Sequence, residues 1–382
     1  MQKTLSAILH FFKNNFIFTI AMLIAMISCF FVPIDKGYLN YFEWDTITCI
    51  FLLLLVIAGL TNIDFFQKVA RFIIKKFKNT RSIIMCLIFI TYVMAIFNAN
   101  DMSLLTLLPL SYIVLKYTNN LKYCAFTFIM QNIASNLGGM IVPIGNPQNL
   151  YIYSYYNVSI WDFLKVMILP TLIALILIII VCLFIKKEPL KYDDNYDNTL
   201  NKTKTILYFI LFGITLLLVF RIIPFWIALI VVTIAMLFID RKAFLKVDYT
   251  IPLTFVAFFI FSGNMSRIPA LVDTLVAFVN KDVYLTAYVS CQLISNVPTA
   301  VLLSKFTTNW QALLVSVNVA SLGIIFSSLS GVIALKEYIK VASNEKLGKN
   351  KGEWYYIGLD LLFNVVGAVI LYPLARLTLL LW

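Results

Sequence analysis

Charged side chains are scarce in this sequence, and that scarcity excludes a soluble protein. Only 13% of the 382 residues are charged, 62% are hydrophobic, and the mean hydropathy is +0.92. A soluble domain of this length has no interior large enough for so much apolar surface. The net charge of +12 does not indicate a nucleic-acid partner, because the basic residues lie between apolar runs. We therefore predict an all-α polytopic membrane protein whose main partner is the lipid bilayer.

Metal-binding and redox motifs are also missing. The six cysteines stand singly within hydrophobic segments, and no two have the Cys-x-x-Cys spacing of a metal or redox site. We expect all of them to be packing residues: Cys29, Cys49, Cys86, Cys124, Cys182 and Cys291. The chain has no glycine-rich Walker loop that would bind ATP. We therefore expect no cofactor, apart from a coupling ion that is itself transported.

Residues that could form an intramembrane enzyme are few. The only histidine is His10, near the N-terminus, and Asp101 is the one acid that we expect deep in an apolar stretch. Catalysis there would require paired carboxylates, a serine beside histidine or lysine, or clustered metal ligands. The sequence therefore disfavours an enzyme.

The apolar segments predict the membrane spans. A helix needs about 20 apolar residues to cross roughly 30 Å of hydrocarbon, with some allowance for tilt. Segments of that length, or nearly so, are 13–32, 44–62, 122–156, 161–185, 204–220, 223–239, 249–264, 308–341 and 356–381. Two further stretches, 82–116 and 283–304, are interrupted by polar residues, so each half is short for a crossing. We interpret both as re-entrant hairpins.

The basic residues predict the orientation of these spans. If the N-terminus is cytoplasmic, 23 of the 30 lysines and arginines fall in the N-terminal 15 residues or in segments on the cytoplasmic side. This positive-inside bias places the C-terminus outside the cell membrane. We expect a single membrane domain over 1–382, in which a polar cytoplasmic linker at 191–203 separates a first half (1–190) from a second half (204–382).

The two halves contain an internal repeat. Asn132-Ile-Ala-Ser-Asn-Leu-Gly138 recurs as Asn318-Val-Ala-Ser-Leu-Gly323, and each copy follows one of the interrupted stretches. The repeats extend over about 41–185 and 244–382, and five crossings separate their corresponding first spans. An odd number gives the repeats opposite orientations in the membrane. Inverted repeats of this kind are typical of secondary transporters.

An amphipathic run follows the first span of each repeat. In the first repeat, positions 66, 69, 73 and 77 are apolar and positions 68, 71, 75 and 78 are basic. That spacing is typical of a helix lying in the membrane interface. The corresponding run in the second repeat, at about 267–280, has a weaker pattern.

Polar residues break the apolar pattern between Asn132 and Leu150. Three glycines and two prolines lie in this stretch, among asparagines and a serine. Irregular backbone at membrane depth occurs only where protein or a water-filled cavity surrounds it, so the break indicates a binding site. Unwound backbone offers carbonyl oxygens to a cation, and helix N-termini offer N–H groups to an anion.

The motifs at these breaks resemble the ion transporter superfamily, which includes divalent-anion/sodium symporters, citrate-transporter-like permeases and the arsenite pump. The resemblance covers nearly the whole chain. It depends on Asn100-Asp101 followed by Pro109-Leu110, on the run from Ser135 to Asn149, and on Ser295-Asn296-Val-Pro-Thr299. It implies two inverted repeats, each with a re-entrant hairpin and an interrupted transmembrane helix whose tips meet near the bilayer midplane. It also implies a homodimer that moves its substrate by an elevator-like shift.

The candidate substrate- and ion-binding residues are those of the two hairpins and two breaks. They are Asn98, Asn100, Asp101, Ser135, Asn136, Gly138, Gly139, Pro143, Gly145, Asn146, Pro147, Asn149, Ser295, Asn296, Pro298, Thr299, Asn318 and Ser321. The alternative is that these small and polar residues only mediate helix packing. Asp101 is either a proton or cation site or the cap of the hairpin's second helix.

The expected activity is secondary transport of a small anion or oxyanion, with a carboxylate favoured. Efflux of arsenite or antimonite remains open, and so does the choice between sodium and protons as the driving ion. The second break reads Ser327-Ser-Leu-Ser-Gly331, where the first has Pro143-Ile-Gly-Asn-Pro147. We therefore expect one well-formed cation site, in the first half. The family resemblance favours Na⁺ as its ion, with Asn100, Asn136, Gly138 and Asn146 as the candidate ligands, and Asp101 beside them is the candidate if the ion is a proton.

Overall fold

The computed structural model describes a helical protein. It describes residues 16–42, 44–65, 68, 76–97, 100–189, 201–219, 222–345 and 352–381. No strand forms within these ranges, where a single isolated bridge joins Asn79 to Pro189. The all-α prediction is confirmed for this part of the chain.

Helices of the first half correspond closely to the predicted apolar segments. They are α2 (Phe16–Phe31), η1 (Lys36–Tyr41), α3 (Trp44–Asn62), α5 (Thr80–Phe97), α6 (Asn100–Tyr117), η2 (Leu121–Tyr123), α7 (Cys124–Gly139), α8 (Pro147–Tyr155) and α9 (Ile160–Leu183). The predicted break lies between α7 and α8, at residues 140–146. Most of the amphipathic run at 66–78, and Asn98 at the tip between α5 and α6, lie outside the described residues.

The second half repeats the order of a helix pair followed by a broken helix. Its elements are α10 (Lys202–Val219), α11 (Phe225–Ile239), α12 (Arg241–Lys246), α13 (Thr250–Met265), α14 (Pro269–Lys281), α15 (Val283–Ile294), α16 (Asn296–Leu303), α17 (Trp310–Val319), η3 (Ile325–Ser327), α18 (Leu329–Asn344), α19 (Glu353–Thr378) and η4 (Leu379–Leu381). The run predicted at about 267–280 forms α14. The linker 191–200 lies outside the described residues.

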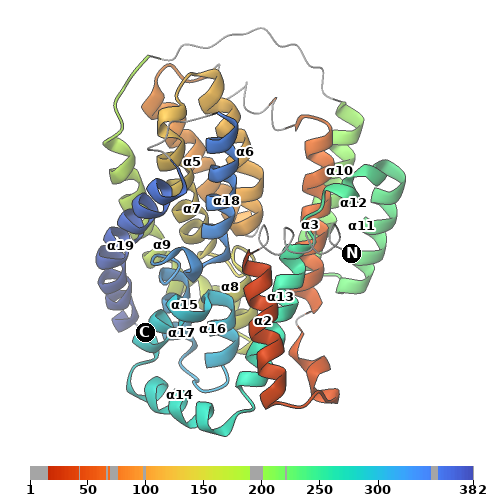
Figure 1. Cartoon of the computed structure of the whole chain (residues 1–382), viewed down its shortest axis with the longest axis vertical. Helices are drawn as coiled ribbons and strands as arrows, with labels where there is room; N and C mark the ends of the chain where they lie inside the picture. The colour runs from red at the N-terminus through yellow and green to blue at the C-terminus, as the bar shows by residue number, and fades with distance from the viewer. Residues whose placement is uncertain are drawn as a thin grey trace, which may run out of the picture.

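The helices form two groups (Figure 1). In one group, α13 packs on α2 and α3, and α3 packs on α10, α11 and α12. In the other group, α7 packs on α5, α6, α18 and α19, and α9 packs on α19. The main connection between the groups is α13 against α16, where the Ser262 hydroxyl lies 3.4 Å from the carbonyl oxygen of Pro298.

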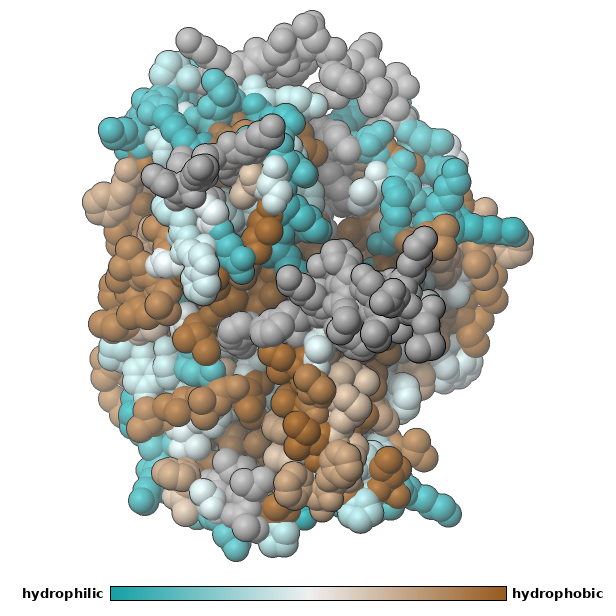
Figure 2. All heavy atoms as spheres, in the orientation of Figure 1, coloured by the Kyte–Doolittle hydropathy of each residue, from teal (hydrophilic) through white to brown (hydrophobic). Residues whose placement is uncertain are grey.

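Apolar side chains cover much of the outer surface. Figure 2 shows hydrophobic residues across the middle of one face and hydrophilic residues toward its two ends. Within the described residues, Ile160–Leu183 and Glu353–Leu381 are long and apolar enough to cross a membrane by length and composition, and the other apolar helices are shorter. Exposed Leu and Ile side chains of α9, such as Ile176 and Leu183, face outward from the helix packing.

Candidate functional site

Four helices begin in the protein interior, close to one another. They are α6 at Asn100, α8 at Pro147, α16 at Asn296 and α18 at Leu329. The backbone N–H of Asn100 donates to the carbonyl oxygen of Gly145 at 2.9 Å, just before α8. The Ser295 hydroxyl, just before α16, donates to the carbonyl oxygen of Ser327 at 3.3 Å, just before α18. Because helix N-termini carry partial positive charge and free N–H groups, their convergence favours anions.

Asn136 is the centre of the first polar cluster. Its Oδ1 accepts hydrogen bonds from Asn100 Nδ2 at 2.8 Å, Ser328 Oγ at 2.9 Å and Ser330 Oγ at 3.0 Å. Its Nδ2 donates to the carbonyl oxygen of Asn132 at 3.0 Å. Asn136 is 1% exposed, so these bonds form away from solvent. A single amide therefore joins α6, α7 and the start of α18.

Asn318 is the centre of a second cluster, on α17. Its Oδ1 accepts from Asn146 Nδ2 at 2.8 Å and from Gln148 Nε2 at 3.2 Å. Its Nδ2 donates to Asn149 Oδ1 at 2.6 Å. Asn146 Nδ2 also donates to the carbonyl oxygen of Asn136 at 3.0 Å, so the two clusters are connected. The break between α7 and α8 therefore contacts α17, the first part of the broken helix in the second half.

The repeated sequence motif makes the same local contact in both copies. The Ser135 hydroxyl donates to the carbonyl oxygen of Asn132 at 2.9 Å, and the Ser321 hydroxyl donates to that of Asn318 at 2.7 Å. Each bond spans three residues at the end of a broken helix. The two motifs therefore correspond in local structure as well as in sequence.

Two glycines allow the first break to fold back on itself. A Cβ added to Gly145 would lie 2.0 Å from the carbonyl oxygen of Gly139, and one added to Gly139 would lie 2.7 Å from that of Gly145. Asn149 Nδ2 closes the loop by donating to three carbonyl oxygens, those of Gly139, Met140 and Val142, at 3.1–3.2 Å. Pro147 starts α8, where its missing N–H costs nothing, and Pro143 is buried in the loop.

The second group of predicted site residues, Ser295 to Thr299, lies at the turn between α15 and α16 and in the first turn of α16. Ser295 has a positive φ of 73°, an uncommon backbone conformation for a residue with a side chain, at the turn between the two helices. Asn296 Oδ1 accepts from the backbone N–H of Val297 at 2.9 Å, and the Thr299 hydroxyl donates to the carbonyl oxygen of Ser295 at 2.7 Å. Pro298 is buried in the first turn of α16. This turn reaches the Asn136 cluster through the Ser327–Ser330 segment.

Several buried oxygen atoms of the clusters have no hydrogen-bond partner among the described residues. They are Asn100 Oδ1, Asp101 Oδ1, Asn146 Oδ1 and Gln148 Oε1. Asp101 is 4% exposed, and its carboxyl group lies close to Ser330. An unpaired buried acceptor carries a desolvation cost of about 1–3 kcal/mol unless a ligand satisfies it. These oxygens are of the type that hard cations prefer.

The predicted sodium ligands are brought together except for one. Asn100, Asn136 and Asn146 lie within one hydrogen-bonded cluster. Gly138 instead faces α5, because a Cβ at that position would lie 2.3 Å from the carbonyl oxygen of Tyr92. We interpret Gly138 as the contact that lets α5 and α7 approach closely.

Sequence reasoning missed other members of the clusters. Ser328 and Ser330 lie in the segment whose lost Gly-Asn-Pro pattern suggested a weakened site, yet both hydroxyls donate to Asn136. Asn132 and Gln148 lay within the polar stretch but were not singled out as ligands. Their neutral side chains gave no signal that separated them from packing residues.

The prediction that Asp101 is the one deep acid was wrong. Asp360 is 1% exposed in the first third of α19. The sequence carried the signal, because position 360 lies inside the apolar segment predicted at 356–381.

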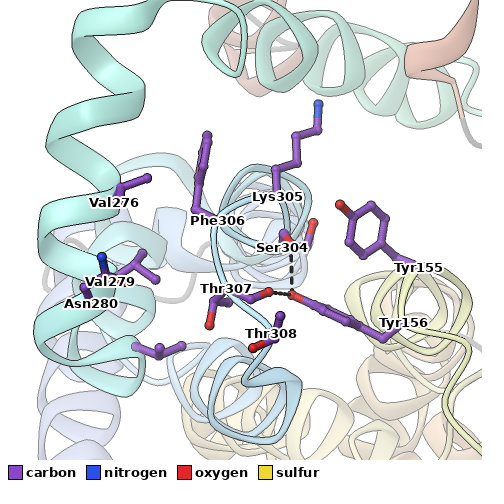
Figure 3. A pocket seen from close by; sticks show the side chains of 11 residues that line it. Tyr155, Tyr156, Val276, Val279, Asn280, Ser304, Lys305, Phe306, Thr307 and Thr308 are labelled. Atoms are coloured by element: carbon purple, nitrogen blue, oxygen red, sulfur yellow. Dashed lines mark hydrogen bonds between the residues drawn. The ribbon is translucent and has the colours of Figure 1, made fainter.

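A separate cavity opens beside the end of α16 (Figure 3). It has a volume of 680 Å³ and is lined by α14, the end of α8 and residues 304–308. Tyr156 OH donates to the carbonyl oxygens of Ser304 at 3.0 Å and Thr307 at 2.6 Å across its wall. Lys305 is the charged residue of its lining, burial lowers the pKa of its ammonium group, and Nζ donates to Ser266 Oγ at 2.7 Å. None of the predicted site residues lines this cavity.

Broken helices that meet around buried amides, inside an apolar exterior, are the architecture of a membrane transporter. The comparisons with known proteins agree with that class. The sequence pattern described as citrate transporter matches residues 8–331, so the chain belongs to the citrate transporter family.

Individual relatives are also named as transporters or membrane proteins. An uncharacterized transporter of Methanocaldococcus jannaschii is 33% identical over 300 residues, which cover 77% of this chain and 81% of that protein. The inner membrane protein YbiR of Escherichia coli K12 is 27% identical over 325 residues, covering 84% of this chain and 87% of that protein. A Dictyostelium discoideum protein named as an arsB transporter is 26% identical over 157 residues, covering 41% of this chain and 27% of that protein.

Proposed function

We propose that this protein is a secondary active transporter of a small anion, with a carboxylate favoured over other oxyanions. The observation that carries the proposal is the meeting of four helix N-termini around buried asparagine and serine side chains. Among the described residues, the buried polar and charged set contains no lysine or arginine. Neutral donors can bind an anion and then release it, because no fixed opposite charge has to be separated from it.

The proposed architecture is a pair of inverted repeats with re-entrant hairpins at α5–α6 and α15–α16. It is supported by the order of elements, since each half has a helix pair followed by a broken helix. It is also supported by the matching hydrogen bonds of Ser135 and Ser321. In this proposal the N-terminus is cytoplasmic and the C-terminus lies outside the cell membrane.

The proposed motion is a shift of one helix group against the other within each subunit of a homodimer. The two groups meet mainly where α13 packs on α16, which leaves few contacts to rearrange. Crosslinking in native membranes tests the dimer, and a chain that crosslinks only as a monomer would contradict that part of the proposal.

The driving ion is proposed to bind in the first half. The unpartnered oxygens of Asn100 and Asn146 suit Na⁺, whereas the carboxyl group of Asp101 suits a proton. The second break supplies the hydroxyls of Ser328 and Ser330 to the same cluster, so the proposal needs one cation site and not two.

Uptake into proteoliposomes separates these possibilities. A panel of dicarboxylates, citrate, other oxyanions and arsenite is tested under an inward sodium gradient at constant pH, and then under a pH gradient with choline in place of sodium. Sodium coupling predicts uptake in the first condition, with a Hill coefficient near one. Proton coupling predicts uptake in the second, and Asp101→Asn should then uncouple it. The proposal fails if neither gradient drives any anion.

A second candidate function is efflux of arsenite or antimonite. It is favoured by the relative that is named as an arsB transporter. Inside-out vesicles that accumulate arsenite, and no carboxylate, would support efflux. In either case we propose that the protein is not an enzyme, so the solute recovered from the vesicles should be chemically unchanged.

A further inference from the structure

Helix α19 carries a polar stripe on its buried face. Tyr356, Asp360 and Asn364 recur at intervals of four residues, and they are 0%, 1% and 3% exposed. On the opposite face of the helix, Leu362, Val366 and other apolar side chains are exposed. The helix therefore turns its carboxyl group toward the protein and away from lipid.

The stripe contains several polar atoms that lack partners. Both carboxyl oxygens of Asp360, the hydroxyl of Tyr356 and Oδ1 of Asn364 have no hydrogen-bond partner among the described residues. The Asn364 amide lies close to the Asp360 carboxyl group, but its Nδ2 donates at 2.9 Å to the backbone carbonyl of Asp360.

Among the residues that the structure describes, no lysine or arginine forms an ion pair with Asp360. Beside the stripe, Cys124 of α7 and Tyr338 of α18 face Tyr356, and the Tyr338 ring stacks on that of Tyr356 at 4.7 Å. The helices and turns packed on α19 are α7, α9, α17, α18, η3 and η4. Their other titratable groups are Asp162, Lys165 and Cys182 on α9, and Lys336, Glu337 and Lys340 on α18.

These remaining groups have other neighbours. Lys340 pairs with Glu337 at 2.5 Å, and the charges acting on Lys336 are those of Asp248, Lys340 and Glu337. Lys165 pairs with Asp162 in the first turns of α9. Arg376 is sixteen residues further along α19 than Asp360, about 24 Å at the rise of an α-helix.

A carboxylate ion without a counter-ion is costly in such an interior, so the group must bind either a proton or a metal cation. A hard metal cation takes several oxygen ligands. The described residues contain no group of three His, Cys, Asp or Glu side chains that could hold a metal, and the backbone carbonyls near Asp360 are engaged within the helix. A proton needs one oxygen only.

We propose that Asp360 is a reversible proton-binding site, separate from the cluster around Asn136. The separation follows from α7, since Cys124 beside the stripe and Asn136 lie twelve residues apart, about 18 Å along the helix. The carboxylate takes up one proton from water, forming one O–H bond, and later returns it. Its role in coupling depends on the transport function proposed above, because a neutral group lets a helix group move in the membrane without carrying a buried charge.

Infrared difference spectroscopy on the purified protein in lipid nanodiscs tests the site without requiring a substrate. As the pH is lowered, the wild-type protein should gain the carbonyl band of a protonated carboxylic acid, with the isotope shift expected in D₂O. Asp360→Asn should remove one component of that band, and the components of Asp101 and of the exposed acids should remain. The matched control is Glu353→Gln, an exposed acid on the same helix, which should retain the Asp360 component.

A second variant covers the case in which Asp360→Asn does not fold. Asn364→Ala removes the amide nearest the carboxyl group and should shift the pH midpoint of the Asp360 component. An unchanged midpoint in that variant, or an Asp360→Asn spectrum identical to that of the wild type, would overturn the proposal. If the band behaves as expected and no gradient drives any anion, the proton site stands and the transport function fails. If an anion is transported and the Asp360 component is absent, only the proton site fails.

Discussion

The side-chain amide of Asn146 donates a hydrogen bond of 2.8 Å to the side-chain oxygen of Asn318, across 172 residues of sequence. This bond joins the broken helix of the first half to that of the second. Because the same amide also donates to the backbone of Asn136, a change at any one of these residues affects both clusters. The predictions below depend on that connection.

Asn136→Ala should abolish uptake and leave folded protein in the membrane. The substitution removes the acceptor shared by Asn100, Ser328 and Ser330. Leaving each such donor unpaired costs about 1–3 kcal/mol, and Ser328 and Ser330 keep each other as hydrogen-bond partners, so the total loss stays below the stability of most domains. Uptake into proteoliposomes measures the effect, and Asn40→Ala, an exposed asparagine, is the matched control. Wild-type uptake in Asn136→Ala would show that the residue only mediates packing.

Asn100→Ala and Asn296→Ala should give the same loss of transport. Asn100 donates directly to Asn136, and Asn296 begins α16 at the neighbouring turn. Fluorescence-detected size exclusion measures whether each variant is folded, and uptake is compared at equal amounts of folded protein. Normal uptake in Asn296→Ala would place the second turn outside the substrate path.

Gly145→Ala should destabilise the first break. The added methyl group would lie 2.0 Å from the carbonyl oxygen of Gly139, so the loop must open. Overpacking of this kind costs about 1–3 kcal/mol, and the Tm should fall by several degrees together with uptake. Gly213→Ala in α10 is the control, because nothing lies within 4 Å of its added Cβ. An equal Tm in both variants would contradict the close approach.

The ion pair between Asp35 and Arg267 should stabilise the folded protein near neutral pH and lose this effect in acid. The guanidinium group donates to both carboxyl oxygens, at 3.0 and 2.5 Å, and these hydrogen bonds hold the pKa of Asp35 below its usual value. Because the folded pKa is the lower one, the pair stabilises the folded protein above the unfolded pKa. That stabilisation is lost as the pH falls through the folded value.

The measurement is the Tm of Asp35→Asn against wild type across acid pH. The variant should melt at a slightly lower temperature near neutral pH and at the same temperature in strong acid. The difference should be small because both side chains are partly exposed. Lys36→Gln is the control, and a Tm difference that persists unchanged in acid would exclude the ion pair as its cause.

Terminal reporter fusions should place the N-terminus in the cytoplasm and the C-terminus outside. The expectation follows from the 23 basic residues that fall on the cytoplasmic side in that orientation. A C-terminal reporter that is active only in the cytoplasm would contradict the odd number of crossings, and the inverted repeat with it.

The sequence alone determined the helical class and the places where the helices end. Lipid offers backbone N–H and C=O groups no hydrogen-bond partner, so the apolar segments had to be helical. The helices are interrupted where Pro, Gly and Asn occur at positions 140–146, and again at Ser295, just before Asn296 and Pro298. Local chemistry of this kind depends on neighbours in the chain. For that reason α3, α9 and α11 begin and end within two residues of the predicted limits.

Only the tertiary structure decided which polar residues meet. Ser328 and Ser330 reach Asn136 across more than 190 residues, and Gly138 turns toward α5 instead of toward the cluster. Asp360 proved to be as deeply buried as Asp101 because α19 packs its polar stripe against α7 and α18. Which faces of distant helices come together depends on the packing of the whole chain, and the sequence of one segment does not contain that information.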